Sequence, residues 1–128
     1  MILLFGGNGQ LGQELRRLSA ARGVPLVALS RSEADIADAA AVGRALAAHK
    51  PQLVMNAAAY TKVDLAETEV EAARQANEIG PQLLAQACAD LGLPLIHIST
   101  DFVFDGTASS PYRPDAATNP LSVYGKTK

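Results

Sequence analysis

The stretch FGGNGQLGQEL, residues 5–15, carries three glycines spaced three residues apart: Gly6, Gly9 and Gly12. The apolar run Ile2–Phe5 precedes it, and Gln10–Arg22 follows it with leucines at helical spacing. A first glycine permits a tight turn, a second lets the backbone approach a ligand closely, and a third lets helix and strand pack together. The pattern predicts a strand, a glycine loop and a helix.

The rest of the chain alternates between the same two patterns. Further strands are expected at 24–29, 52–58 and 94–99, and helices at 38–50, at 69–91 with a bend at Gly80-Pro81, and from Leu121 onward. Each strand is a continuous apolar run, which is typical of a parallel sheet covered on both faces. We therefore expect an α/β fold with a Rossmann-type doubly wound parallel sheet in three layers. Residues 101–119 form a long irregular loop, and long loops are usually functional.

Composition excludes several classes of protein. The 128 residues are 48% hydrophobic and 19% charged, with a formal net charge of -2, so one globular domain is expected and no nucleic-acid partner. Cys88 is the only cysteine, and no internal disulfide is available. The opening MILLF is too short for a signal-peptide core, and no run is long enough to span a membrane. A cytoplasmic location is the expectation.

The glycine loop predicts a dinucleotide site. Amide groups at the start of the following helix, together with the helix dipole, suit phosphate groups. The candidate cofactor-binding residues of this loop are Gly6, Gly9, Gln10, Leu11 and Gly12. The alternative is a glycine-rich turn without a ligand, which the flanking strand and helix disfavour.

The end of the second strand bears on the choice of cofactor. An acidic residue there would bind the ribose of NAD, but this chain has Ser30 and Arg31. A hydroxyl and a guanidinium suit a 2′-phosphate, so NADP(H) is favoured, with NAD(H) as the alternative because Glu33 is close. Arg31 as a solvated surface residue stays open. Asp35 and Ile36 are placed beside the adenine by position alone.

The third strand ends in NAAAYT, which puts Ala58, Ala59 and Tyr60 at the carboxyl edge of the sheet. Small side chains there leave room for the ribose and nicotinamide. Alanines also suit plain packing of a helix on a sheet, and the sequence does not separate the two interpretations.

Tyr124 and Lys128 stand four residues apart on one face of the last predicted helix. An ammonium near a phenol lowers the phenol pKa, so that a tyrosine can exchange a proton near neutral pH. Thr100 follows the fourth strand and could hold a substrate carbonyl. The alternative is a Tyr and a Lys that merely share an exposed helix face.

Four motifs in order carry a resemblance: the glycine loop, NAAAYTKVDLAE, STDFVFDG and NPLSVYGKTK. Together they resemble the extended short-chain dehydrogenase/reductases, and among these the dTDP-4-dehydrorhamnose reductases. The resemblance covers essentially the whole chain. It implies reduction of the 4-keto group of dTDP-4-dehydro-L-rhamnose by NADPH or NADH, giving dTDP-L-rhamnose for cell-surface polysaccharide.

The resemblance also implies roles for residues. Tyr124 would donate the proton, Lys128 would lower its pKa and hold the nicotinamide ribose, and Thr100 would bond the sugar. Asp101 and Val103 would lie beside the dTDP-sugar substrate. Asn77 resembles a helix asparagine that supports the lysine through water, with an exposed polar residue as the alternative. Some relatives use Mg²⁺, whose ligands would lie outside this segment; no metal ligand is expected within it.

Relatives of this type are much longer, so residues 1–128 are expected to be an NAD(P)-binding Rossmann domain without its C-terminal substrate domain. Such a piece is expected to bind nucleotide weakly and to turn over poorly. Another nucleotide-sugar epimerase or dehydratase of the superfamily, and a non-catalytic subunit like the beta subunit of methionine adenosyltransferase, are the alternatives. The oligomeric state is open, with a homodimer as one alternative. Asp64, Glu67 and Glu69 are expected to form a solvated helix start, and His97 to be structural.

Overall fold

The computed structural model describes residues 1–128 and contains one parallel sheet. Its strands are β1 (Ile2–Phe5), β2 (Leu26–Leu29), β3 (Leu53–Asn56) and β4 (Leu95–His97), in the order β2-β1-β3-β4. Phe5 is in register with both Leu29 and Asn56, so three strands end at the same level. The strand order reverses between β1 and β3, and ligands of such sheets bind outside the carboxyl ends at this point.

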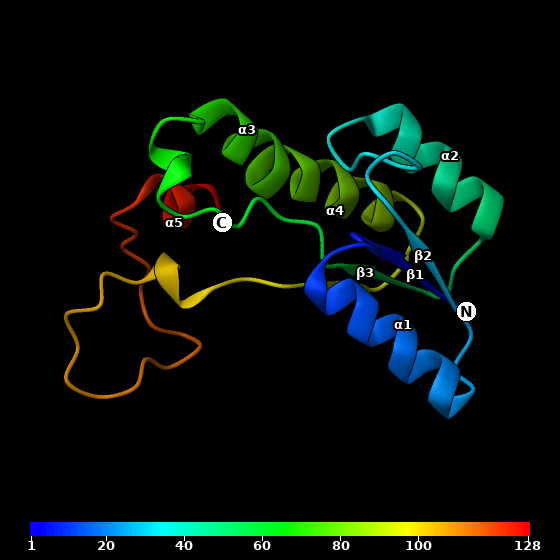
Figure 1. Cartoon of the computed structure of the whole chain (residues 1–128), viewed down its shortest axis with the longest axis horizontal. Coiled ribbons are helices and arrows are strands. Elements are labelled where there is room, and N and C mark those ends of the chain that lie inside the picture. Colours follow the sequence, from blue (N-terminus) through cyan, green and yellow to red (C-terminus); the bar gives the residue numbers. More distant parts are fainter.

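Helices cover both faces of the sheet. They are α1 (Gln10–Arg22), α2 (Ala39–His49), α3 (Val70–Arg74), α4 (Gly80–Asp90) and α5 (Val123–Thr127). Helix α1 lies on one face, whereas α2, α3 and α4 lie on the other (Figure 1). The predicted doubly wound, three-layer α/β fold is confirmed. None of these helices combines the length and apolarity that crossing a membrane requires.

The hydrophobic core lies between the sheet and the pair α2 and α4. Its strand residues include Leu3, Phe5 and Val54, and its helix residues include Val42 and Leu84. The other face is covered less completely. Two of the leucines that define the helical spacing of α1 are exposed, Leu11 at 41% and Leu18 at 39%. The spacing predicted the helix correctly, but these leucines take no part in the core.

Local hydrogen bonds explain why some elements are shorter than the apolar runs. Gly23 has φ 62°, and its amide and that of Val24 bond back to the carbonyls of Ala20 and Ser19. Val24 therefore completes the end of α1, and β2 begins only at Leu26. Asp38 accepts bonds from two amides of the first turn of α2, so it precedes the helix as its cap.

The long helix expected at 69–91 is a composite. A π-helical turn, Gln75–Ile79, joins α3 to α4, and the Gly80 amide closes it by bonding the Gln75 carbonyl. Pro81 has no N–H with which to continue the ladder, and the wider turn accommodates this within the helix. The irregularity therefore begins five residues before Gly80 instead of at Gly80-Pro81.

Candidate functional site

The glycine loop between β1 and α1 is built so that only glycine fits at two of its positions. Gly6 has φ 84°, and a Cβ there would lie 2.4 Å from the Ala58 nitrogen. A Cβ at Gly12 would lie 2.3 Å from the Gly6 carbonyl oxygen. The first hydrogen bond of α1 runs from the Gln13 amide to the Gly9 carbonyl. The amides of residues 10–12 come before this bond, so they take no part in the hydrogen-bond ladder of the helix.

A cavity of about 240 Å³ opens at the carboxyl ends of β1 and β3. It is bordered by many of the residues predicted to bind the cofactor: Gly6, Gly9, Arg31, Asp35, Ile36, Ala58, Ala59 and Tyr60. Sequence reasoning did not identify Asn8, Gln75 and Ala76, which also border it. Gln75 and Ala76 belong to the π-helical turn, for which the sequence offers only the signal of Pro81.

The residues at the end of β2 form hydrogen bonds and an ion pair with one another. Arg31 Nε lies 2.8 Å from Asp35 Oδ2, although the Arg31 side chain is 82% exposed. Burial raises the pKa of Asp35, but bonds from the Ala37 amide and Arg31 outweigh it and leave the pKa lowered. The Glu33 carboxylate accepts bonds from the Ser30 hydroxyl and amide, which lower its pKa. Ser30 borders a neighbouring hollow with Asn8 and Arg31, outside the 240 Å³ cavity.

Asn56 organises the end of β3, a role that sequence reasoning missed. Its amide donates to His97 Nδ1 at 3.1 Å, and its oxygen accepts from the Ala58 amide at 3.0 Å. Burial, and then the Lys128 charge, lower the pKa of His97, in keeping with an imidazole that accepts at Nδ1. His97 therefore has a structural contact, as the sequence analysis expects.

Helix α5 carries the predicted Tyr124, is followed directly by Lys128 as its C-terminal cap, and is fixed at its start. Ser122 caps it by accepting from the Gly125 amide at 3.0 Å. The Val123 amide donates to Glu67 Oε1 at 2.9 Å, and Tyr60 donates its hydroxyl hydrogen to the Glu69 carboxylate. Both glutamates are exposed and Glu69 directly precedes α3, as the predicted solvated helix start requires. Each also bonds to another segment of the chain, which the sequence did not reveal.

Tyr124 is packed by its ring and free at its hydroxyl. The side chain is 8% exposed, and its ring meets that of Phe102 edge-on, with centroids 5.5 Å apart. The hydroxyl makes no hydrogen bond within the chain, and no buried polar side-chain atom lacks a partner. The Tyr124 hydroxyl is therefore reachable from the surface.

Lys128 follows the end of α5, and its side chain is directed to the residue after β4. Its ammonium donates to the Ile98 carbonyl at 2.7 Å and makes no hydrogen bond to the Tyr124 hydroxyl. Burial lowers the pKa of Lys128. Neither Tyr124 nor Lys128 borders the 240 Å³ cavity; Lys128 borders a separate hollow beside Asn77 and His97.

The predicted substrate residues follow β4 in a single 3₁₀ turn, Asp101–Val103. The Thr100 hydroxyl caps this turn, donating to Asp101 Oδ1 at 3.2 Å and accepting from the Phe102 amide at 3.3 Å. Asp101 borders a third hollow, together with Phe104 and Leu121. Thr100 and Val103 border neither the 240 Å³ cavity nor any of these three hollows.

Asp105 holds the long loop together, and sequence reasoning missed it. Its carboxylate accepts from the amide and hydroxyl of Thr107, the Tyr112 hydroxyl and the Asn119 amide. These bonds, led by that from Asn119, hold the pKa of Asp105 well below its usual range. The signal was present in the sequence, because an Asp two residues before an amide partner is a common turn device.

The structure brings together no group of three His, Cys, Asp or Glu side chains that could hold a metal ion. The Tyr60 phenol stays protonated over a wide range, because burial and then the Glu69 carboxylate raise its pKa to about 12.

Comparison with known proteins places this site in a family. The family model described as RmlD substrate binding domain matches residues 1–128. The chain belongs to this RmlD family. A dTDP-4-dehydrorhamnose reductase of Streptomyces griseus is 48% identical over 126 residues, which cover 98% of this chain and 41% of that protein.

Solved structures of RmlD relatives agree in fold. A dTDP-4-dehydrorhamnose reductase of Clostridium acetobutylicum matches with a TM-score of 0.93 and 40% identity, over 98% of this chain and 45% of that one. The same enzyme of Bacillus anthracis, in complex with NADP, matches with a TM-score of 0.93 and 32% identity, over the same shares of the two chains. The chain thus spans less than half the length of these relatives.

Proposed function

We propose that residues 1–128 form the cofactor-binding part of an NAD(P)H-dependent reductase that converts dTDP-4-dehydro-L-rhamnose to dTDP-L-rhamnose. The observation that carries this proposal is the arrangement of the cavity. The glycine loop and the alanines after β3 border it, and α5 presents the free Tyr124 hydroxyl from the same end of the sheet. Membership of the RmlD family supports the same substrate class.

The residues present fit a dinucleotide. At Gly6 and Gly12 the space that a Cβ would fill is taken by backbone, which keeps the loop tight beneath a pyrophosphate. The amides of Gln10, Leu11 and Gly12 precede the α1 ladder and can donate to phosphate oxygens, as helix N-termini commonly do. Ala58, Ala59 and Tyr60 would border the ribose and nicotinamide, and Asp35 and Ile36 the adenosine.

The chemistry needs a hydride donor and a proton donor. A bound nicotinamide would supply a hydride to the keto carbon. Tyr124 would give its phenolic proton to the oxygen as it becomes an alcohol, and its free hydroxyl suits this step. Lys128 would stabilise the resulting phenolate by its positive charge. Thr100, Asp101 and Val103 would contact the sugar nucleotide from the 3₁₀ turn after β4.

A further region of the protein would complete the substrate site. This part of the proposal rests on two observations: the chain spans 41% of the Streptomyces griseus relative, and large apolar side chains lie open beyond the core. Ile96 on β4 is 44% exposed and Leu121 before α5 is 68% exposed.

Selection of NADP over NAD is proposed to depend on Arg31. We expect Arg31→Ala to weaken NADPH binding on the order of tenfold, because charge-assisted bonds to a phosphate are lost. NADH binding should change less than about twofold, because NADH lacks this phosphate. Parallel fluorescence titrations of the 128-residue chain measure both affinities.

The matched control is Arg17→Ala, because Arg17 is also exposed and paired with a carboxylate, Glu14, on its own helix. It should change neither affinity. Equal loss of NADPH and NADH binding in the Arg31 variant would show that Arg31 does not contact the 2′-phosphate.

Turnover tests the function itself. The full-length protein that contains residues 1–128 is mixed with NADPH and dTDP-4-dehydro-L-rhamnose, and the products are separated by chromatography. We expect one dTDP-L-rhamnose for each NADPH consumed. Epimerisation of a nucleotide sugar without net consumption of cofactor would show that the protein is an epimerase. Binding without any turnover would show that it is a non-catalytic subunit.

A further inference from the structure

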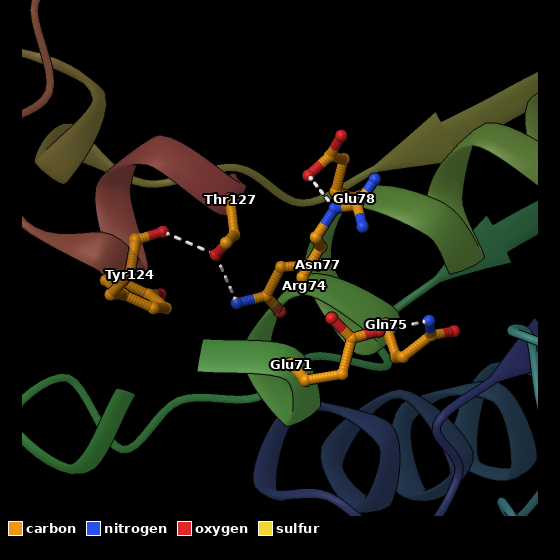
Figure 2. Close-up of polar contacts among 7 residues, drawn as sticks. All are labelled: Glu71, Arg74, Gln75, Asn77, Glu78, Tyr124 and Thr127. Carbon is orange, nitrogen blue, oxygen red and sulfur yellow. Dashed lines mark hydrogen bonds and ion pairs between the residues drawn. The ribbon is translucent and has the colours of Figure 1, made fainter. Parts of the chain in front are cut away.

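Thr127 is the last residue of α5, directly before Lys128, and its hydroxyl makes two hydrogen bonds. It donates to the Tyr124 carbonyl at 2.9 Å and accepts from Asn77 Nδ2 at 3.2 Å. Thr127 is 8% exposed and Asn77 2% exposed, so both bonds are shielded from water. Figure 2 shows the chain of contacts running from Asn77 through Thr127 to the Tyr124 backbone.

Asn77 extends this connection to the wall of the cavity. Its oxygen accepts from the Tyr60 amide at 2.8 Å, and its nitrogen also donates to the Tyr60 carbonyl at 3.0 Å. The two hydrogens of the amide nitrogen and one lone pair of the oxygen are thus used. The exposed-residue interpretation of Asn77 was wrong.

The π-helical turn delivers Asn77 to this position. Two side-chain contacts flank the turn: a bond from Gln75 to Glu71 at 2.6 Å and an ion pair of Arg74 with Glu78 at 3.2 Å (Figure 2). π-helical turns are rare and are frequent at functional sites. The turn therefore sets a buried amide between the loop after β3 and α5. The bond from Asn77 to Thr127 joins residues 50 apart in the sequence.

We propose that Thr127 is a positioning residue of the reductase: through Asn77 it fixes α5, and with it Tyr124 and Lys128, to the Tyr60 backbone at the cofactor cavity. This inference rests on the proposed function. A threonine that only bonds its own helix would be a local feature. Thr127 differs from such a threonine by its buried bond to Asn77. A valine of the same shape would leave one hydrogen of the Asn77 amide without an acceptor.

The test compares three variants in the full-length protein that contains residues 1–128. Thr127→Val removes the hydroxyl and Thr127→Ser keeps it. Thr68→Val is the matched control, because the Thr68 hydroxyl makes the same bond to the carbonyl three residues earlier, that of Leu65, but is exposed. Thr127→Ala, which removes the hydroxyl without adding bulk, replaces the valine variant if that one does not fold.

For Thr127→Val we expect kcat to fall on the order of tenfold to a hundredfold, since small misplacement of reacting groups is costly. The KM for NADPH should stay within about twofold. Thr127→Ser and Thr68→Val should keep the wild-type kcat.

A Thr127→Val enzyme that melts at a lower temperature but keeps the wild-type kcat would show that Thr127 has only a structural role, and would overturn the inference. A loss of kcat that serine does not restore would do the same. If the wild-type protein reduces no dTDP-4-keto sugar, it is the proposed function that fails, and this outcome is read from the wild type alone.

Discussion

Replacing Tyr124 with phenylalanine is expected to lower kcat by on the order of 10²–10⁴-fold, because the reaction loses its proton donor. The fold should survive, since the edge-on contact with Phe102 involves the ring and the hydroxyl has no partner within the chain. NADPH consumption with dTDP-4-dehydro-L-rhamnose measures the rate in the full-length protein. A thermal melt of each variant establishes that the fold is kept.

Tyr112→Phe is the matched control for this substitution. It also removes a phenolic hydroxyl, one that bonds Asp105 in the long loop and has no assigned part in the proton transfer. Its kcat should stay within a few-fold of the wild type. A Tyr124→Phe variant that retains the wild-type kcat would show that Tyr124 is not the proton donor, even if its affinity for the cofactor has changed.

The second large effect is expected at Gly125, which the sequence analysis did not identify. A Cβ at this position would lie 2.2 Å from the Phe102 carbonyl oxygen and 3.1 Å from the Pro120 Cβ. Backbone of the 3₁₀ turn cannot move aside as the end of a flexible side chain could. Gly125→Ala should therefore lower the free energy of unfolding by about 1–3 kcal/mol, the usual range for overpacking. It should also separate α5 from the turn that carries Thr100 and Asp101.

Gly43→Ala should change the free energy of unfolding in the opposite direction. Gly43 is an exposed residue of α2, and a Cβ there meets nothing within 4 Å. Alanine at an exposed helix position should raise the free energy of unfolding by about 0.5–1 kcal/mol. Urea denaturation of both variants tests the pair. Equal stability of Gly125→Ala and the wild type would contradict the close contact between α5 and the Phe102 backbone.

The sequence was sufficient for the elements and for the glycine loop. Strand and helix positions agree with the apolar runs to within a few residues, because continuous apolar runs and leucines at helical spacing are local consequences of burial. The ends differ where a cap intervenes, as at Val24 and Asp38. Gly6, Gly9, Ala58 and Tyr60 could be placed at one cavity from the sequence because carboxyl ends of parallel strands share one edge.

The contacts that hold the site were beyond local patterns. Glu67 looked like a solvated helix residue, and Asn77 was as compatible with an exposed turn as with a functional one. In the structure, Glu67 is exposed as predicted but also binds the start of α5, and Asn77 joins Tyr60 to Thr127. A local pattern records whether a side chain is apolar or polar, but it does not record which distant group will lie opposite it.

Local periodicity and turn chemistry thus determined the α/β alternation, the glycine loop and the tyrosine–lysine pair, because each depends on neighbours within one helical turn or strand. Tertiary structure alone decided that Gly125 lies against the Phe102 carbonyl, that Leu11 and Leu18 stay exposed, and that Thr127 and Asn77 are bonded. These facts depend on packing between segments far apart in the chain. A buried polar group must find its partner there, wherever in the sequence that partner lies.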